Sequence, residues 1–367
     1  MKITGLQIFW IIFTFQTGNM LLLAVNPTII DAKQDAWISA IISIILGIVI
    51  VLIATRVALF YPKQTLIEFC KQILGKWIGT TIVLCYFIQW YSVIGNILGE
   101  FAQFTITILL PSTPSWSLIV TMLIVIIYVT NIGGIEGIAR CSEVFGPLVL
   151  LMVTGLVFFT IPNFDIQKIL PIYSDTGFIQ IIKGSLSPLS FLGESVIMMM
   201  LVAFMDEPKK GPSRAVWGII ISGFFVSTAT ISVLMVFGPH ISQKLLFPAI
   251  DMVRFISIMK FIQNLEIVAV LIWILSVFIK LSVYFFAASY GTAQLLKIKD
   301  WKKAIWFVAI VTFVLAIFQP TITLFGAEYV KKYWVKYALP INMVGIPILL
   351  LIVGGIRKRF APANKAS

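Results

Sequence analysis

Charged side chains are scarce in this sequence. Asp, Glu, Lys and Arg together make up 11% of its 367 residues, whereas hydrophobic residues make up 60%. A soluble domain carries about 25% charged residues, and the mean hydropathy of +1.03 is far above that of such domains. The composition therefore excludes an ordinary soluble protein and predicts an integral membrane protein.

Cysteine and histidine are also rare, with three cysteines (Cys70, Cys85, Cys141) and a single histidine, His240. Neither residue type has metal-ligand spacing, and the chain has no Walker loop, HExxH motif or nucleophile elbow. The sequence thus predicts no metal, no cofactor and no enzymatic activity. The net charge of +12 is spread over helix ends, which favours contact with anionic lipid headgroups in the bilayer over nucleic-acid binding.

Ten apolar stretches of roughly 20 residues, the length that crosses a bilayer, fill the chain. We expect spans at about 6–30, 37–60, 78–110, 116–133, 142–161, 184–205, 214–238, 265–294, 304–326 and 338–356. If the N-terminus is cytoplasmic, 17 of the 27 basic residues lie on the cytoplasmic side. This positive-inside bias predicts that both termini are cytoplasmic.

Two spans are interrupted by glycine and polar residues, the first at Thr17, Gly18 and Asn19 and the sixth at Gly193, Glu194 and Ser195. Paired interruptions in two halves of a chain are typical of inverted-repeat transporters that bind substrate at the membrane midplane. We therefore predict an all-α polytopic membrane protein of about ten helices in a five-plus-five inverted repeat, with helices 1 and 6 broken. The predicted parts of this single transmembrane domain are a first repeat at 1–161, an outer connector at 162–183, a second repeat at 184–356 and a basic cytoplasmic tail at 357–367.

The interrupted spans supply the predicted ligand-binding residues: Thr17, Gly18, Asn19, Gly193, Glu194 and Ser195. Freed backbone groups there can bind a small zwitterion, although a glycine such as Gly18 also allows close helix packing. A carboxylate at mid-bilayer costs at least about 2.5–3.5 kcal/mol, so Glu194 should face the protein interior. It either binds ligand or carries a proton, or it is a hydrogen-bonded structural residue.

The third span carries a stripe of polar residues at steps of three or four, which places them on one helix face. From end to end the stripe covers about 27 Å at 1.5 Å per residue. It predicts either a hydrated pathway or hydrogen bonds between helices. Its members are Gln89, Ser92, Asn96, Glu100, Gln103 and Thr107.

The eighth span presents Ser276, Lys280 and Tyr284 at intervals of four residues. An ammonium group this deep requires a carboxylate, carbonyl groups or water, and we expect Glu194 or Glu100 to be its partner. Lys280 and Tyr284 therefore join the predicted proton or water pathway. Either Lys280 replaces the sodium ion of related transporters, or it forms a purely structural ion pair.

Two connections are longer than turns, at 162–183 and 239–264. Both should lie outside, and each is expected either to form short surface helices over an access path or to serve as a simple connector. The second includes an alternating stretch from Met252 to Ile256.

Several local patterns are distinctive: Gly75-Lys76-Trp77-Ile78-Gly79, Ser190-Phe191-Leu192-Gly193-Glu194, Leu246-Phe247-Pro248, Asn264-Leu265-Glu266 and Ile272-Trp273. With these patterns in this order, the chain resembles the spore germination B-subunit family, the endospore germination permeases. In helix 1 this chain reads Gly18-Asn19-Met20-Leu21-Leu22, with Asn26-Pro27 later, in place of the family's glycine-rich break and Leu-Pro.

The resemblance implies a member of the amino-acid–polyamine–organocation superfamily in the inner membrane of spores. It implies partner A and C subunits and the binding of a nutrient germinant, often an amino acid, that triggers germination. Gly193 and Glu194 match the family's helix 6 pattern. The alternative function is a proton-coupled secondary transporter of amino acids or amines.

Overall fold

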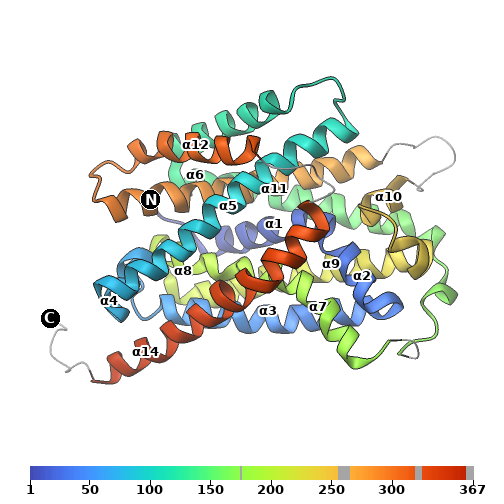
Figure 1. The fold of residues 1–367 in the computed structure, drawn as a ribbon, viewed down its shortest axis with the longest axis horizontal. Helices are drawn as coiled ribbons and strands as arrows, with labels where there is room; N and C mark the ends of the chain where they lie inside the picture. Colours follow the sequence, from blue (N-terminus) through green and yellow to red (C-terminus); the bar gives the residue numbers. More distant parts are fainter. Residues whose placement is uncertain (174–175, 255–264, 319–324, 361–367) are drawn as a thin grey trace.

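The computed structural model describes residues 1–173, 176–254, 265–318 and 325–360. In these ranges the chain forms helices that run roughly side by side, and the N-terminus and the last turn of α14 lie toward the same end of the bundle (Figure 1). We call this the N-terminal end. Within the described residues the only extended pairing is an isolated bridge between Ile3 and Met205 at that end.

The first half of the chain contains five spans. Span 1 consists of α1 (Gly5–Leu23) and α2 (Val25–Ala32), and a short 3-10 turn η1 (Lys33–Asp35) leads into span 2, α3 (Ala36–Ala58). The amphipathic helix α4 (Leu66–Leu74) precedes span 3, α5 (Lys76–Ile108). Spans 4 and 5 are the two parts of α6 (Ser115–Thr160), which bends at Gly134, where φ is 54°.

The second half also contains five spans. Span 6 combines α7 (Phe178–Leu192), η4 (Gly193–Ile197), α8 (Met198–Leu201) and η5 (Val202–Phe204), and η6 (Pro208–Lys210) leads into span 7, α9 (Gly211–Ser242). After α10 (Pro248–Arg254), span 8 is α11 (Glu266–Leu296) and span 9 is α12 (Lys302–Ile317). Span 10 joins the π-helix η7 (Phe325–Gly345) to α14 (Ile346–Phe360).

These helices confirm the predicted all-α polytopic fold. Eight helical tracts of the described chain are long and apolar enough to cross a membrane. One of them is α6, whose 46 residues would be about 69 Å long at 1.5 Å per residue, twice the hydrocarbon thickness. Dividing α6 at Gly134 and adding the shorter α12 gives ten spans, five before the predicted outer connector and five after it.

Helix 1 is interrupted six residues later than we predicted. Residues 17–19 lie inside α1, and the helix is interrupted only at Ala24. Pro27 explains the position, because a proline cannot donate to the carbonyl four residues earlier, here Leu23, and its ring collides with that carbonyl. Thr17 instead supports the helix, since its hydroxyl donates to the Phe13 carbonyl at 2.6 Å. The predicted unwinding at Thr17, Gly18 and Asn19 is therefore wrong.

The break in helix 6 is confirmed where the sequence placed it. The α-helical pattern ends at Leu192, and residues Gly193–Ile197 form a 3-10 helix. A five-residue 3-10 stretch inside a helix is unusual and often marks a functional hinge. Pro188 contributes locally, because it removes one of the backbone donors of the preceding turn.

Other boundaries differ modestly from the sequence prediction. Span 6 begins at Phe178 and span 7 continues to Ser242 across a kink at Gly238. The connector between the halves contains the short 3-10 turns η2 (Ile161–Asn163) and η3 (Ile166–Ile169). The second connector contains α10, whereas residues 255–264, which include the end of the alternating stretch and Asn264, lie outside the described residues, as do tail residues 361–367.

Polar contacts hold both connectors against the bundle. The fully buried Asp35 accepts hydrogen bonds from the Tyr173 backbone and from the Thr176 hydroxyl. In α10, Arg254 lies 3.3 Å from both Asp251 and Glu266. Partial burial raises the pKa of the Asp251 carboxyl, and Arg254 opposes that rise.

Glycines set several helix contacts in the core. A Cβ at Gly146 in α6 would lie 2.3 Å from Cε3 of Trp10 in α1, so only glycine lets these helices approach so closely.

The cysteines are free, and burial raises the pKa of the Cys70 thiol.

The Gly146 contact yields a stability prediction. Replacing Gly146 with Val should lower the thermal stability of the purified protein by about 1–3 kcal/mol, the usual cost of overpacking. The control is Gly155→Val in the same helix, where an added Cβ meets nothing within 4 Å. Thermal unfolding in detergent measures both, and equal losses would contradict the assigned contact.

Candidate functional site

A buried ion pair lies between spans 6 and 8. The ammonium group of Lys280 is 2.9 Å from Oε1 and 2.8 Å from Oε2 of Glu194. The two side chains are only 1% and 2% exposed. Between the two candidate carboxylates that the sequence offered to Lys280, the structure selects Glu194.

Tyr284 completes the polar contacts of the carboxylate by donating its hydroxyl hydrogen to Oε2 of Glu194 at 2.8 Å. It lies one helical turn beyond Lys280 on α11, so both side chains leave the same helix face. The ring of Trp334 in η7 also approaches the carboxylate. Glu194 is thus held by groups from span 8 and span 10.

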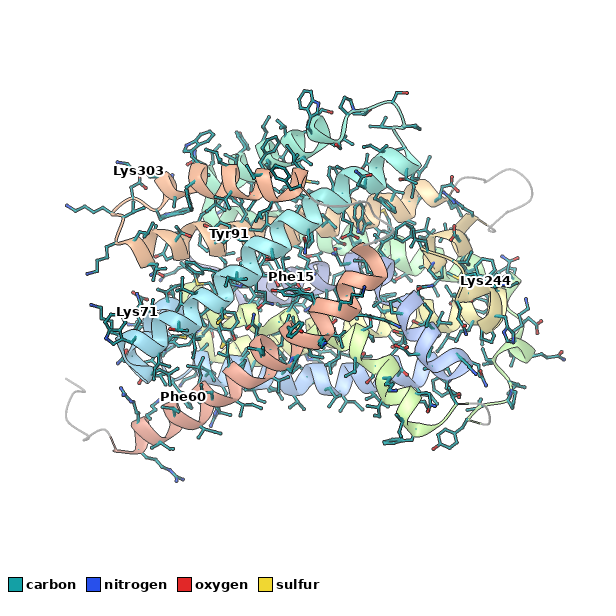
Figure 2. All side chains as sticks on the ribbon, viewed as in Figure 1. Phe15, Phe60, Lys71, Tyr91, Lys244 and Lys303 are labelled. Carbon is teal, nitrogen blue, oxygen red and sulfur yellow. The ribbon has the colours of Figure 1, made fainter. Side chains whose placement is uncertain are left out.

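Two aromatic rings enclose the ammonium group. Nζ of Lys280 lies 5.1 Å from the ring centre of Phe15 and 5.4 Å from that of Phe191. Both distances are within the range of cation–π attraction. Phe15 lies at the middle of the bundle (Figure 2), which places the ion pair midway along the helices. We call Glu194, Lys280, Tyr284, Phe15 and Phe191 the central site.

The 3-10 helix of span 6 positions Glu194. Gly193 packs against span 10, because a Cβ there would lie 2.7 Å from the sulfur of Met343. Ser195, the third predicted residue of this segment, is fully buried, and its hydroxyl has no hydrogen-bond partner among the described residues. The segment therefore brings Glu194 to α11 and leaves a polar hydroxyl beside it.

The predicted helix 1 residues lie beside the central site without being unwound. A Cβ at Gly18 would lie 2.5 Å from the Cβ of Ser276, one turn before Lys280, so Gly18 allows α1 and α11 to touch. Of the two interpretations left open by the sequence, the structure supports close packing. Asn19 follows Gly18 in the chain, and the side-chain oxygen of Asn19 is buried without a partner in the described chain. The nearby Gln16 donates to the carbonyl of Leu192 at 3.3 Å, linking α1 to the break in span 6.

The polar stripe of α5 divides into two parts. Gln89 accepts a hydrogen bond from Asn342 at 3.0 Å, and Ser92 lies near Tyr333, so this part contacts span 10. Further along, Asn96, Glu100 and Gln103 are partly buried, and one carboxylate oxygen of Glu100 is enclosed without a partner among described groups. Glu100 forms no ion pair with any described residue. Thr107, at the end of the stripe, is exposed and donates to the Gln103 carbonyl.

Sequence reasoning missed the contribution of span 10. Trp334 reaches the site although the predicted tenth span began only at residue 338. Asn342 and Met343 lie inside the predicted span, but nothing in the sequence indicated that they reach the flank of the site. Lys331, Lys332 and Lys336 reduce the hydropathy of η7 and explain the late prediction. The ion pair between Lys331 and Asp31 at 3.1 Å joins η7 to the end of α2.

The groups of the central site are suited to the recognition of charge. Within the described ranges no group of three His, Cys, Asp or Glu residues could hold a metal ion. The site offers one carboxylate, one ammonium group, aromatic faces and several buried oxygen atoms. Such a set suits a small molecule that carries both an ammonium group and a carboxylate.

A family profile described as "Spore germination protein" matches residues 2–323. The chain belongs to the spore germination protein family. The comparison confirms the resemblance that the sequence motifs indicated.

Characterised relatives have the same family name. Spore germination protein YndE of Bacillus subtilis (strain 168) is 30% identical over 309 residues, which cover 81% of this chain and 82% of YndE. Spore germination protein KB of the same organism is 23% identical, with 82% and 80% covered. Spore germination protein XB of Bacillus anthracis is 25% identical, with 74% and 75% covered.

Solved structures with the same fold are membrane transporters. A Na⁺-coupled sialic acid symporter superposes with a TM-score of 0.63 at 14% identity, covering 86% of this chain and 74% of the symporter. MhsT in complex with L-phenylalanine gives a TM-score of 0.63 at 14% identity, covering 95% and 98%. At these identities the likeness shows the fold alone, which this chain shares with both proteins.

The central site of this germination-family protein yields an energetic prediction. Removing one partner of a buried ion pair costs about 3–5 kcal/mol, because the other charge stays buried without compensation. Lys280→Met and Glu194→Gln should each destabilise the protein by roughly that amount. The double variant should lose much less stability than the sum of the two single losses, since neither charge then remains. Thermal unfolding of all four proteins measures the coupling, and additive losses would contradict it.

Proposed function

We propose that this protein is the membrane subunit of a nutrient germinant receptor. It binds a small germinant, an amino acid, at the central site and triggers spore germination. One observation carries the proposal: the buried pair of Glu194 and Lys280 beside the break in span 6. Family membership and the transporter fold support the same function.

The charges of the site support a zwitterionic ligand. A neutral ligand that separates Glu194 from Lys280 would leave two buried charges without partners, at a cost of several kcal/mol. An amino acid avoids that cost, because its ammonium group pairs with Glu194 while its carboxylate pairs with Lys280. The net charge inside the membrane then stays at zero before and after binding.

Ligand exchange at Glu194 also supplies a signal. A ligand shifts a conformational equilibrium only when it binds two states with different affinity. The paired state, in which Lys280 and Tyr284 contact Glu194, excludes the ligand. A second state with Lys280 turned toward the ligand carboxylate would bind it. The 3-10 segment at Gly193–Ile197 is the element that would change between them.

In this proposal the charge of Lys280 takes the place of a coupling sodium ion. Its ammonium is already neutralised by Glu194 and faced by two aromatic rings. The protein therefore needs no sodium at this site, and the binding of a germinant should be independent of sodium concentration.

We also propose the cellular setting. The protein is a multi-pass subunit of the spore inner membrane, with both termini cytoplasmic, and it acts with receptor A and C subunits. The positive-inside bias of the sequence supports this orientation, and the family supports the partners. Co-purification of tagged protein with the A and C subunits from spores tests the partnership.

A proton-coupled secondary transporter of amino acids or amines is the second candidate function. Its support is the fold shared with transporters and the part of the α5 stripe that contains Glu100, whose buried oxygen lacks a partner in the described chain. This part would serve as the proton or water pathway.

Binding tests the main proposal. In lipid nanodiscs, one or more of the twenty amino acids should raise the melting temperature of the protein. Lys280→Met and Glu194→Gln should each weaken that binding on the order of 100-fold, since each removes one charge-paired contact with the ligand. The control is Glu136→Gln, which removes a carboxylate that forms an exposed pair with Arg140. Equal effects of Glu194→Gln and Glu136→Gln would contradict the central site.

Uptake separates the two functions. In proteoliposomes with an inward proton gradient, a receptor subunit should bind a labelled amino acid without accumulating it. Spores carrying Lys280→Met should germinate poorly with that amino acid and normally with a germinant detected by another receptor. Accumulation that depends on the gradient, together with normal germination of the Lys280→Met spores, would favour the transporter.

A further inference from the structure

An open groove of about 370 Å³ lies on the outer surface of the bundle, between α3, α9 and α14 and away from the central site. Spans 2, 7 and 10 therefore share it. Its lining consists of six apolar residues and one basic residue: Val49, Leu52, Ile53, Arg56, Leu59, Pro212 and Leu351.

The residues from α3 lie on one face of that helix. Leu52 and Ile53 each lie three or four residues from both Val49 and Arg56, and Leu59 follows Arg56 by three at the end of the helix, so the five form one row. From the first to the last, the row is about 15 Å long at 1.5 Å per residue. That length is half the hydrocarbon thickness of a bilayer, the depth that one acyl chain occupies. Leu351 of α14 borders the same row.

The groove ends in positive charge. Arg56 lies in the last turn of α3 and is exposed, and it has no ion-pair partner in the described part of the chain. A guanidinium group in this position can bind a phosphate through two parallel hydrogen bonds. The groove thus combines an apolar floor with an unneutralised cation at one end.

Two neighbouring features add to the charge at this end. Pro212, which lines the groove, lies in the first turn of α9, whose N-terminus has no side-chain cap. The start of a long helix favours an anion. On α14, Lys358 lies seven residues after Leu351 and therefore on the same face. Its ammonium group is 5.6 Å from the ring centre of Phe60 in the turn that follows α3.

From this geometry we propose that the groove binds an anionic phospholipid. One acyl chain lies along the apolar row of α3, and the phosphate contacts Arg56, the first turn of α9 and Lys358. Basic pockets between helices at the membrane surface are the features that select anionic headgroups. The lipid fastens span 2 of the first half to spans 7 and 10 of the second half.

The lipid site is independent of the central site. Figure 2 labels Phe60, beside the groove, near the N-terminal end of the bundle, whereas Phe15 marks the central site at its middle. The bound lipid would therefore stabilise the bundle whether or not a germinant is present.

The test compares lipids on the purified full-length chain in detergent. Phosphatidylglycerol should raise the melting temperature in a concentration-dependent way and remain attached in native mass spectra, whereas phosphatidylcholine should do neither. Arg56→Gln should raise the phosphatidylglycerol concentration needed for half the shift at least about tenfold, the loss of one charge-assisted contact. Leu52→Trp, which fills the groove and leaves its charge unchanged, should weaken binding similarly.

Arg140→Gln is the matched control, because Arg140 is an exposed arginine of α6 that does not line the groove. It should leave phosphatidylglycerol binding unchanged. If Arg56→Gln and Arg140→Gln weakened phosphatidylglycerol binding equally, the lipid would be attracted by surface charge in general and not bound in the groove. If glycerol 1-phosphate stabilised the protein as much as phosphatidylglycerol does, the site would bind a phosphate group and not a lipid. A full response in Leu52→Trp would show that no acyl chain occupies the groove.

Discussion

The buried contact between Glu194 and Lys280 constrains the rest of this structure. Two opposite charges lie at the middle of a helical bundle, and each is almost completely enclosed. Neither can be exposed to lipid without a large penalty, so spans 6 and 8 must stay in register along their length. Tyr284, one turn along α11, fixes the orientation of the carboxylate, and the rings of Phe15 and Phe191 complete the enclosure around the ammonium group.

Small residues make that enclosure possible. Gly18 lets α1 approach Ser276 on α11, and Gly193 lets span 6 approach Met343 on span 10. Both contacts border the ion pair, and a methyl group at either position would separate the helices. Membrane helices lack a hydrophobic drive to associate and depend on such close packing. Gly18 and Gly193, which the sequence analysis assigned to helix breaks, therefore also allow the helices to pack closely around the ion pair.

The hydropathy of the sequence was sufficient to predict the spans, and the cost of intramembrane charge was sufficient to predict that Lys280 has a carboxylate partner. The break in span 1 was misplaced because Gly18 was given more weight than Pro27, although only proline removes a backbone donor. The π-helix η7 could not be predicted, since its extra residue per turn is stabilised by tertiary contacts such as Asn342 with Gln89. For the same reason the sequence could not show that Trp334 reaches Glu194.

The two parts of the α5 stripe indicate how a change at the ion pair would spread. Span 10 contacts Glu194 through Trp334 and α5 through Asn342, so it connects the central site to the stripe. A ligand that replaced Lys280 at Glu194 would alter the contacts of the 3-10 segment, and Gly193, which packs against Met343, would pass that change to span 10. Span 10 would then shift relative to Gln89, whose amide nitrogen is buried without a partner in the described chain. A receptor requires this kind of connection, because a binding event must reach surfaces that partner subunits can detect.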